Sequence, residues 1–381
     1  MASSDDLGAP SVCRHDARAA ILRSPGPFEI EPISLDDPRD DEVLVRLVAT
    51  GLCHTDIIAR DQLYPVPQPI VLGHEGAGVV EKVGAAVSHV QPGDHVVLTF
   101  MSCGECRTCR NGTPAYCLKL FGLCFGGARA DGSSAIRDAD HEMVHGHFFG
   151  QSSFATRAVA NARNVVKVRP DAPLEMLGPL ACGLQTGAGA ILNVLRPQKG
   201  QSVAIFGGGA VGLSAVMAAK LLGAKPIIVV DVNPQRLGLA RELGADVTID
   251  ARSADVVAQI REACGGEGVA FALEAAGRSE VVRQAIDSLG QLGICGIVGA
   301  PAVGSEASFD ITELMVAGKT IRGIVEGDSV PDAFIPQLVD LYLSGKFPID
   351  RLVRTYEFEA INQAMADAES GEVIKPIILM P

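Results

Sequence analysis

The chain has 381 residues, of which 48% are hydrophobic, so it is long enough for two domains and can bury a large core. Its formal net charge of −13 disfavours nucleic acid and anionic membranes as partners, because both repel an acidic protein. Residues 1–18 are polar and acidic, and we predict a flexible tail there rather than a secretory signal. The longest uncharged apolar stretch, residues 203–219, contains a glycine cluster and does not suit a membrane span. We therefore expect a cytoplasmic protein.

The first part of the chain has a β-rich pattern, and a later part has alternating strands and helices. Residues 19 to about 99 contain short β-like runs broken by Pro, Gly and Asp, at 42–50, 71–84 and 94–100. Residues 103–150 are irregular and rich in glycine. From residue 201 strands alternate with helices, which indicates a parallel sheet with right-handed crossovers. This alternation fades after residue 325, and the last segment mixes helix and strand.

A glycine motif lies at the start of the alternating region. Gly207, Gly209 and Gly212 follow a predicted strand and open a predicted helix, where a pyrophosphate can approach the backbone. The next predicted strand ends at Asp231, whose carboxylate is placed to bind a ribose 2′-hydroxyl and to repel a 2′-phosphate. This favours NAD over NADP, and Arg236 is expected to lie along the adenosine ribose. The alternative is a glycine-rich turn followed by an ordinary aspartate at a strand end.

Four cysteines lie close together in the irregular region. They have the spacing CxxCxxCx7C and are Cys103, Cys106, Cys109 and Cys117. Four thiolates suit tetrahedral zinc, and a closed four-cysteine shell leaves no position for substrate, so we expect a structural site. Disulfides are disfavoured in a reducing compartment, and iron–sulfur runs usually have another spacing. A nucleic-acid-reading finger is disfavoured by the acidic charge of the chain.

A second metal site is suggested by three residues that are far apart in the sequence. Cys53, His74 and Cys182 provide one imidazole and two thiols, which is a ligand set of catalytic zinc sites that keep a fourth position open. Each residue alone is weak evidence, because a single buried cysteine is more often a small hydrophobic residue and a single histidine more often a core residue. Together with the glycine motif and the four-cysteine loop, however, the three residues strongly indicate a catalytic zinc site.

With these motifs, the chain resembles the zinc-dependent medium-chain alcohol dehydrogenases. The match includes G-H-E from Gly73, followed by Gly78, Gly84 and Val87, and it extends from about residue 19 to residue 381. The resemblance implies an α/β fold with a GroES-like, β-rich catalytic domain at 19–183 and 327–381. This domain would be split around a Rossmann-type, doubly wound parallel sheet at 184–326. It also implies a homodimer or homotetramer that acts on a small alcohol or aldehyde.

The resemblance implies two zinc ions per chain, one structural and one catalytic. The catalytic ion would be held by Cys53, His74 and Cys182, with Glu75 close behind it. Asp56 would bind His74 and fix the orientation of its ring. Zinc would act as a Lewis acid on the alcohol oxygen while hydride passes reversibly to NAD.

The resemblance also assigns roles to polar residues near the cofactor. Thr55 would accept the alcohol proton, His54 would face the cofactor phosphates, and Thr186 would lie against the nicotinamide. Taken alone, Thr55, Asp56 and Thr186 would be interpreted as ordinary turn-capping residues. Many family members have a histidine where this chain has Ile58, so we expect the proton path to end differently here and the site rim to be more apolar.

Three segments, 51–67, 146–156 and 327–336, resemble the benzyl and aryl-alcohol branch of the family. Phe100, Phe148 and Phe149 are candidates for aromatic walls of the substrate pocket. The expected substrates are therefore primary aromatic or allylic alcohols. Two alternatives stay open, a thiol-dependent formaldehyde dehydrogenase and a protein that binds NAD and zinc without catalysis.

Overall fold

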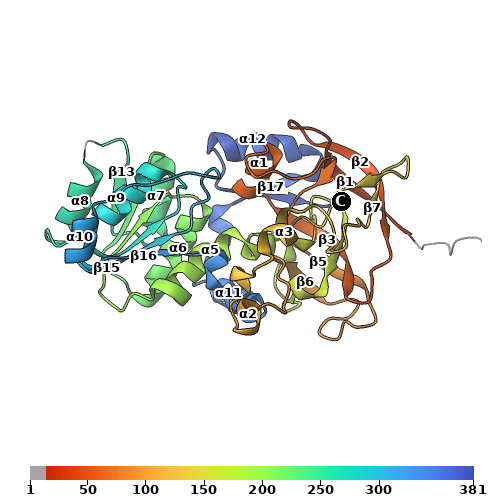
Figure 1. The fold of residues 1–381 in the computed structure, drawn as a ribbon, viewed down its shortest axis with the longest axis horizontal. Helices are drawn as coiled ribbons and strands as arrows, with labels where there is room; N and C mark the ends of the chain where they lie inside the picture. The colour runs from red at the N-terminus through yellow and green to blue at the C-terminus, as the bar shows by residue number, and fades with distance from the viewer. Residues whose placement is uncertain (1–13, 254) are drawn as a thin grey trace, which may run out of the picture.

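The computed structural model describes residues 14–253 and 255–381. The predicted tail is wrong for residues 14–18, because they form the first half of strand β1 (Arg14–Leu22), which pairs with β2 (Glu29–Asp36). Residues 1–13 of that predicted tail lie outside the described residues. The molecule has two halves, and segments from both ends of the chain build the right half in Figure 1.

The left half contains a parallel sheet with the strand order β13-β12-β11-β14-β15-β16. Its strands are β11 (Val203–Phe206), β12 (Ile227–Asp231), β13 (Val247–Asp250), β14 (Val269–Glu274), β15 (Leu289–Ile297) and β16 (Thr320–Gly323). The order reverses between β11 and β14, which is the point where ligands bind in doubly wound sheets. This sheet lies within the predicted range 184–326, and the domain bounds themselves stay a prediction.

Helices cover both faces of this sheet. The helices are α6 (Ala210–Leu222), α7 (Pro234–Leu243), α8 (Val256–Ala263) and α9 (Ser279–Asp287). In β11, Val203 and Ile205 belong to the core that contains α6 and α7, whereas Ala204 and Phe206 belong to the core that contains α8 and α9. Because successive strand residues point to opposite faces, this alternation confirms the predicted doubly wound sheet.

The right half contains two further sheets. The larger has the order β10-β6-β5-β3-β18-β17, with β9 also paired to β3, and the smaller has the order β4-β1-β2-β7-β8. Their remaining strands are β3 (Glu42–Gly51), β4 (Ile70–Val71), β5 (Gly76–Val83), β6 (His95–Leu98), β7 (Ile136–Arg137), β8 (Met143–Val144), β9 (Arg157–Asn161), β10 (Val165–Lys167), β17 (Val353–Glu357) and β18 (Lys375–Leu379). The pairing of β18 with β3 brings the end of the chain into the N-terminal sheet, as expected for a split β-rich domain.

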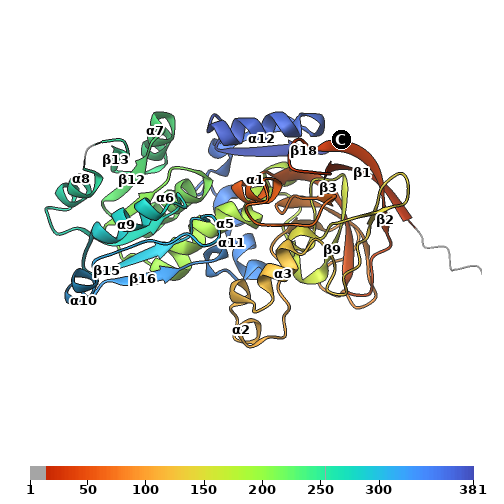
Figure 2. The same ribbon diagram turned by 45° about the horizontal axis from the view of Figure 1, so that its top comes forward.

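The other helices are short, except for two near the C-terminus. They are α1 (His54–Arg60), α2 (Arg107–Arg110), α3 (Leu120–Phe125), α4 (Leu174–Leu177), α5 (Gly183–Gly189), α10 (Ile311–Val316), α11 (Pro331–Leu343) and α12 (Ile361–Ser370). In Figure 2, α12 lies along the same side of the molecule as α1. In the part of the chain that the structure describes, no helix combines the length and apolar character needed to cross a membrane.

Candidate active site

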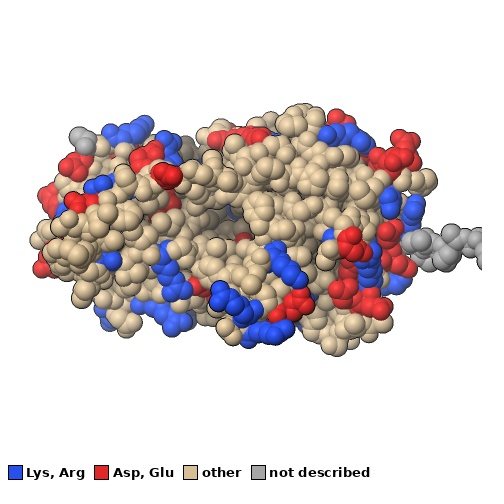
Figure 3. Space-filling model, viewed as in Figure 1, with Lys and Arg blue, Asp and Glu red and all other residues tan. Residues whose placement is uncertain are grey.

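A cavity of about 980 Å³ lies between the two halves. Figure 3 shows the surface hollowed at this place. The glycine turn and Asp231 line the cavity on the side of the parallel sheet, and Cys53 and Cys182 line it on the other side. The sequence-predicted residues that share this cavity also include His54, Thr55, Thr186 and Arg236. The fold thus brings both predicted sites to one continuous space.

The glycine turn joins β11 to α6 at the carboxyl edge of the sheet. Gly207 has a φ of +104°, which favours glycine, and a side chain at Gly212 would lie 1.8 Å from the Gly207 carbonyl oxygen. Beside Gly209, the residue before α6, the space is open. The free backbone N–H groups of the first helical turn therefore face a space that suits a pyrophosphate.

Asp231 ends β12 and is 7% exposed. Its carboxylate accepts hydrogen bonds from the backbone N–H groups of Gly208, at 2.5 Å, and Asn233, at 2.7 Å. These bonds fix the side chain at the cavity. Arg236 lines the same region, and its buried Nε has no hydrogen-bond partner among the described residues. A buried donor without a partner fits a ligand with acceptor oxygens.

Four potential metal ligands meet at the other end of the cavity. One donor atom each of Cys53, His74, Glu75 and Cys182 lies within 4.8 Å of the other three. Cys53 directly precedes α1 and Cys182 directly precedes α5, whereas His74 follows a tight bend at Gly73. Gly73 has a φ of +87°, and a side chain there would lie 2.5 Å from the backbone nitrogen of Phe154.

Asp56 connects three parts of this site. One carboxylate oxygen accepts from the backbone N–H of Cys53, at 3.0 Å, and the other accepts from Gly73, at 3.2 Å, and from His74 Nδ1, at 3.0 Å. The predicted Asp56–His74 contact is therefore present. It leaves His74 Nε2, which is buried and without a hydrogen-bond partner among the described residues, free to bind a metal.

The two thiols of the cluster differ in acidity. The hydrogen bond between them lowers the pKa of Cys53 well below its usual value and raises that of Cys182. A thiolate is the form that binds metal. The orphaned imidazole nitrogen, the carboxylate and the thiols together fit zinc, which accepts N, O and S ligands.

Lys375 is a site residue that the motifs did not indicate. Its Nζ lies 2.6 Å from a carboxylate oxygen of Glu75, and both side chains are almost completely buried. Burial raises the pKa of Glu75 to about 7, although Lys375 opposes the shift. Lys375 lies on β18, about 300 residues from Glu75, and no local pattern in the sequence links the two.

Glu326 is a second residue that sequence reasoning missed. It lines the cavity, is 9% exposed, and has one carboxylate oxygen 3.4 Å from Cys182 Sγ. Its other carboxylate oxygen lies 3.3 Å from Thr186 Oγ1 and 3.3 Å from Gln185 Nε2. The cavity therefore contains a buried carboxyl group beside two sequence-predicted residues.

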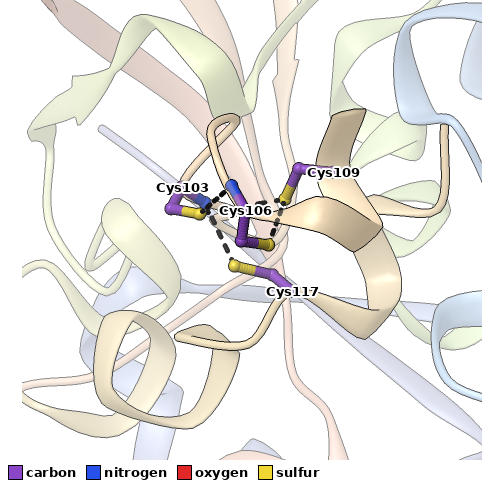
Figure 4. A group of neighbouring side chains, drawn as sticks. All are labelled: Cys103, Cys106, Cys109 and Cys117. Atoms are coloured by element: carbon purple, nitrogen blue, oxygen red, sulfur yellow. Dashed lines mark hydrogen bonds between the residues drawn. The ribbon is translucent and has the colours of Figure 1, made fainter. Parts of the chain in front are cut away.

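The four-cysteine loop forms a separate cluster that includes α2, because Cys109 lies in this helix and Cys106 directly precedes it (Figure 4). One sulfur atom from each residue lies within 4.8 Å of the others, and the cysteines of the described residues are free thiols rather than disulfides. Backbone N–H groups donate to these sulfurs, at 3.2 Å from Cys103 to Cys117 and at 3.4 Å from Cys106 to Cys103. Such donors stabilise thiolates, and the arrangement fits a closed tetrahedral zinc site.

A row of aromatic rings leads from the surface to His74. Ring centroids are 4.8 Å apart for Phe121 and Phe125, 5.3 Å for Phe125 and Phe149, and 4.5 Å for Phe149 and His74. Phe121 is 55% exposed. Tyr64, Phe125 and Leu120 also line the cavity, and no motif in the sequence marks them.

Two expectations about the pocket walls are wrong. Phe100 and Phe149 line the cavity, but Phe148 is fully buried behind it and packs edge-on against Phe149. Ile58 is buried and does not line the cavity, and the apolar lining from α1 comes from Ile57. Both errors concern the direction of neighbouring side chains, which the backbone decides.

Comparison with known proteins gives the following matches. The family described as an alcohol dehydrogenase GroES-like domain matches residues 39–170, and the family described as a zinc-binding dehydrogenase matches residues 210–344. A geraniol dehydrogenase from Castellaniella defragrans is 48% identical over 366 residues, which cover 95% of this chain and 97% of that protein.

Two solved structures are similar over nearly the whole chain. An alcohol dehydrogenase zinc-binding domain protein from Burkholderia ambifaria has 58% identity and a TM-score of 0.95, and the match covers 97% of this chain and 100% of that one. Benzyl alcohol dehydrogenase from Acinetobacter calcoaceticus has 50% identity and a TM-score of 0.93, and the match covers 96% of this chain and 100% of that one.

Proposed function

The chain belongs to the zinc- and NAD-dependent alcohol dehydrogenases of the medium-chain family, and we propose that it oxidises primary alcohols whose carbinol carbon adjoins an aromatic ring or a double bond. Geraniol is an allylic alcohol and benzyl alcohol an aromatic one, so the names of two relatives support this class. The products are the conjugated aldehydes, and the hydride transfer is reversible.

The observation that carries the proposal is the aromatic row that ends at His74. Phe125 and Phe149 line the cavity between the exposed Phe121 and the metal cluster. Aromatic rings pack well against flat, apolar groups through edge and offset contacts. A planar phenyl or alkenyl group therefore fits along this row while its hydroxyl group reaches the cysteine–histidine cluster.

We assign the metal residues as follows. The catalytic zinc is held by Cys53, His74 and Cys182, with Glu75 within reach of a fourth position, and Asp56 orients His74. Zinc bound there supplies Lewis-acid polarisation of the alcohol oxygen. The structural zinc is held by the four-cysteine loop, which consists of Cys103, Cys106, Cys109 and Cys117.

The remaining roles concern the proton and the cofactor. Thr55 Oγ1, which lies 3.8 Å from Cys53 Sγ, accepts a hydrogen bond from the alcohol hydroxyl. As the alcohol ionises, the Thr55 hydroxyl takes its proton and passes its own proton on to water in the cavity. NAD supplies the hydride acceptor, and Asp231 receives the ribose hydroxyls. The cofactor residues are Gly207, Gly209, Gly212, Asp231, Arg236, Thr186 and His54, all of which except Gly212 line the cavity.

The test compares matched pairs of alcohols with NAD⁺ and zinc-loaded protein. Benzyl alcohol is paired with cyclohexylmethanol, and geraniol with citronellol, because each pair has similar size but differs in conjugation at the carbinol carbon. Ethanol and S-(hydroxymethyl)glutathione complete the set. NADH formation gives kcat/KM for each substrate. We expect the conjugated member of each pair to be preferred by at least about tenfold, and ethanol to be poor.

Other outcomes have clear meanings. Equal rates within both pairs would reject the aromatic and allylic class while leaving the family assignment intact. A strong preference for the glutathione adduct would favour the formaldehyde dehydrogenase alternative. No NADH from any substrate, in protein that carries two zinc ions, would favour a non-catalytic protein.

A further inference from the structure

Glu326 lies on an unusual turn between the two halves. It follows β16 and begins the short turn Glu326–Asp328, whose three residues have φ values of +48°, +64° and +50°. Two of them are not glycine, so the left-handed conformation costs free energy that the surrounding contacts must offset. Such a turn holds a side chain in one direction, and here Glu326 is directed into the cavity while Asp328 is not among the cavity-lining residues.

The carboxylate of Glu326 is held by a buried polar network. It accepts from Thr186 Oγ1 and from Gln185 Nε2, each at 3.3 Å, and Gln185 in turn accepts from Ser329 Oγ at 2.9 Å. Gln185, Ser329 and Thr186 are themselves buried. None of the steps assigned to the reaction above uses this carboxylate.

The position of the cofactor follows from the residues at the two ends of the cavity. A dinucleotide with its adenosine ribose at Asp231 and its pyrophosphate at the glycine turn must extend its nicotinamide toward the cysteine–histidine cluster, because hydride transfer requires contact with the alcohol. Glu326 and Thr186 both line the cavity, and Glu326 lies 3.4 Å from Cys182 Sγ and 3.3 Å from Thr186 Oγ1, which places the two residues at that end. The carboxylate is therefore close to the place where the nicotinamide ring has to lie.

The two redox states of that ring differ in charge. The oxidised ring is a cation and the reduced ring is neutral. A carboxylate that is 9% exposed interacts more strongly with a cation than with a neutral ring. Burial raises the pKa of Glu326 to about 7, so the two redox states are compared at about pH 8, where the carboxylate form predominates. We propose that Glu326 makes the cofactor site discriminate between the two states, binding NAD⁺ more tightly relative to NADH than the site would without this carboxylate. The inference rests on the proposed function, because it uses the cofactor position assigned there.

Glutamine at position 326 is the informative substitution. It keeps the size of the side chain and one acceptor oxygen for Thr186, but it removes the negative charge. A purely structural role would change the affinities for NAD⁺ and NADH by the same factor. A charge effect changes their ratio, because the interaction is made with one redox state.

The experiment measures equilibrium binding to zinc-loaded protein without substrate. NADH is titrated by its fluorescence, and NAD⁺ and ADP-ribose by displacement of NADH. For Glu326→Gln we expect the ratio Kd(NADH)/Kd(NAD⁺) to fall by about tenfold, mainly through weaker NAD⁺ binding. The Kd for ADP-ribose, which lacks the nicotinamide, should stay within about twofold of the wild-type value.

Asp328→Asn is the matched control. Asp328 belongs to the same turn, but its carboxylate accepts from Tyr116 Oη at 2.5 Å and pairs with Arg322. This variant should leave the ratio unchanged. An equal fall in Asp328→Asn, or an unchanged ratio in Glu326→Gln, would overturn the inference.

A second variant and the binding of the probes to wild-type protein cover the remaining outcomes. If Glu326→Gln does not fold, Glu326→Asp withdraws the carboxylate by one methylene group and should lower the ratio two- to threefold, so an unchanged ratio there rejects the inference. If wild-type protein binds none of the three probes, the proposed cofactor site fails and this inference fails with it. Binding of all three with an unchanged ratio rejects the inference alone.

Discussion

Asp56 and His74 form a hydrogen bond of 3.0 Å between a carboxylate oxygen and Nδ1, and neither side chain has exposed surface. Because the same carboxylate also accepts from the backbone of Cys53 and Gly73, it holds two candidate ligands and the bend between them. The bond places the Nδ1 proton toward Asp56, so that Nε2 is the nitrogen available to metal.

Asp56→Asn is therefore expected to weaken binding of the catalytic zinc by about 10- to 100-fold. Competition with a chelator, followed by the zinc content of the protein, measures the affinity. The structural zinc should be retained. Asp61→Asn, at the exposed end of the same helix, is the control, and equal zinc affinity in Asp56→Asn and wild type would contradict the assignment.

Ile58→His tests the route of the alcohol proton. Ile58 is three residues after Thr55 on α1, so the two side chains share one side of the helix. A free imidazole titrates near about pH 6.5, and burial at position 58 lowers that pKa, so a histidine there is expected to add an ionisation below about pH 6.5 to the pH profile of kcat. Since position 58 is buried, some loss of stability is also expected. Ile58→Leu is the control, and a folded Ile58→His enzyme with an unchanged profile would refute the prediction.

Asp231→Asn tests the choice between NAD and NADP. Removing the negative charge at the end of β12 should weaken the repulsion of a 2′-phosphate and lower the NAD/NADP ratio of kcat/KM by about tenfold. The control is Asp250→Asn, at the end of the neighbouring strand β13 and not among the cavity-lining residues. The same ratio in both variants would show that Asp231 does not select the cofactor.

Glu42 and Arg129 form a buried ion pair that joins β3 to the long segment after the four-cysteine loop. The carboxylate accepts from Arg129 at 2.6 and 2.8 Å, and from the Arg39 backbone at 2.9 Å. Burial alone would raise the pKa of Glu42, but the bonds to Arg129 and Arg39 outweigh it and lower the pKa below 4.5.

We expect Glu42→Gln to lower the free energy of unfolding by about 3 kcal/mol near neutral pH, because buried Arg129 would keep only the more distant carboxylate of Asp36, at 4.0 Å, as a charged partner. The folded-state pKa is depressed, so this stabilisation is present above the unfolded-state pKa and is lost as the pH falls through the folded-state pKa. Denaturant unfolding at several pH values should show the gap closing in acid. Glu31→Gln, which removes an exposed pair with Arg23, should cost less than about 1 kcal/mol; a comparable loss there would contradict the role of burial.

Short-range patterns in the sequence by themselves determined the glycine turn, the four-cysteine loop and the parallel sheet. The steric freedom of glycine predicts the turn at Gly207, and the spacing of Cys103 to Cys117 places four sulfurs in one loop before any tertiary contact is known. The alternation of strands and helices after residue 201 predicts the parallel sheet, because parallel strands need crossover connections. The first two features depend on residues that are close together in the sequence. The third depends only on the order in which strands and helices follow one another.

Only the tertiary structure decided the long-range contacts of the site, the extent of β1 and the direction of the aromatic side chains. Lys375 reaches Glu75, and Glu326 reaches Cys182, because segments far apart in the chain pack against one another, and such contacts leave no local pattern. Residues 14–18 form a strand because β2 supplies their hydrogen-bond partners. Whether Phe148 or Phe149 faces the cavity depends on a left-handed backbone at Phe149, with a φ of +53°. Pairing, burial and side-chain direction are properties of the assembled fold, since each requires a partner surface that the local sequence does not contain.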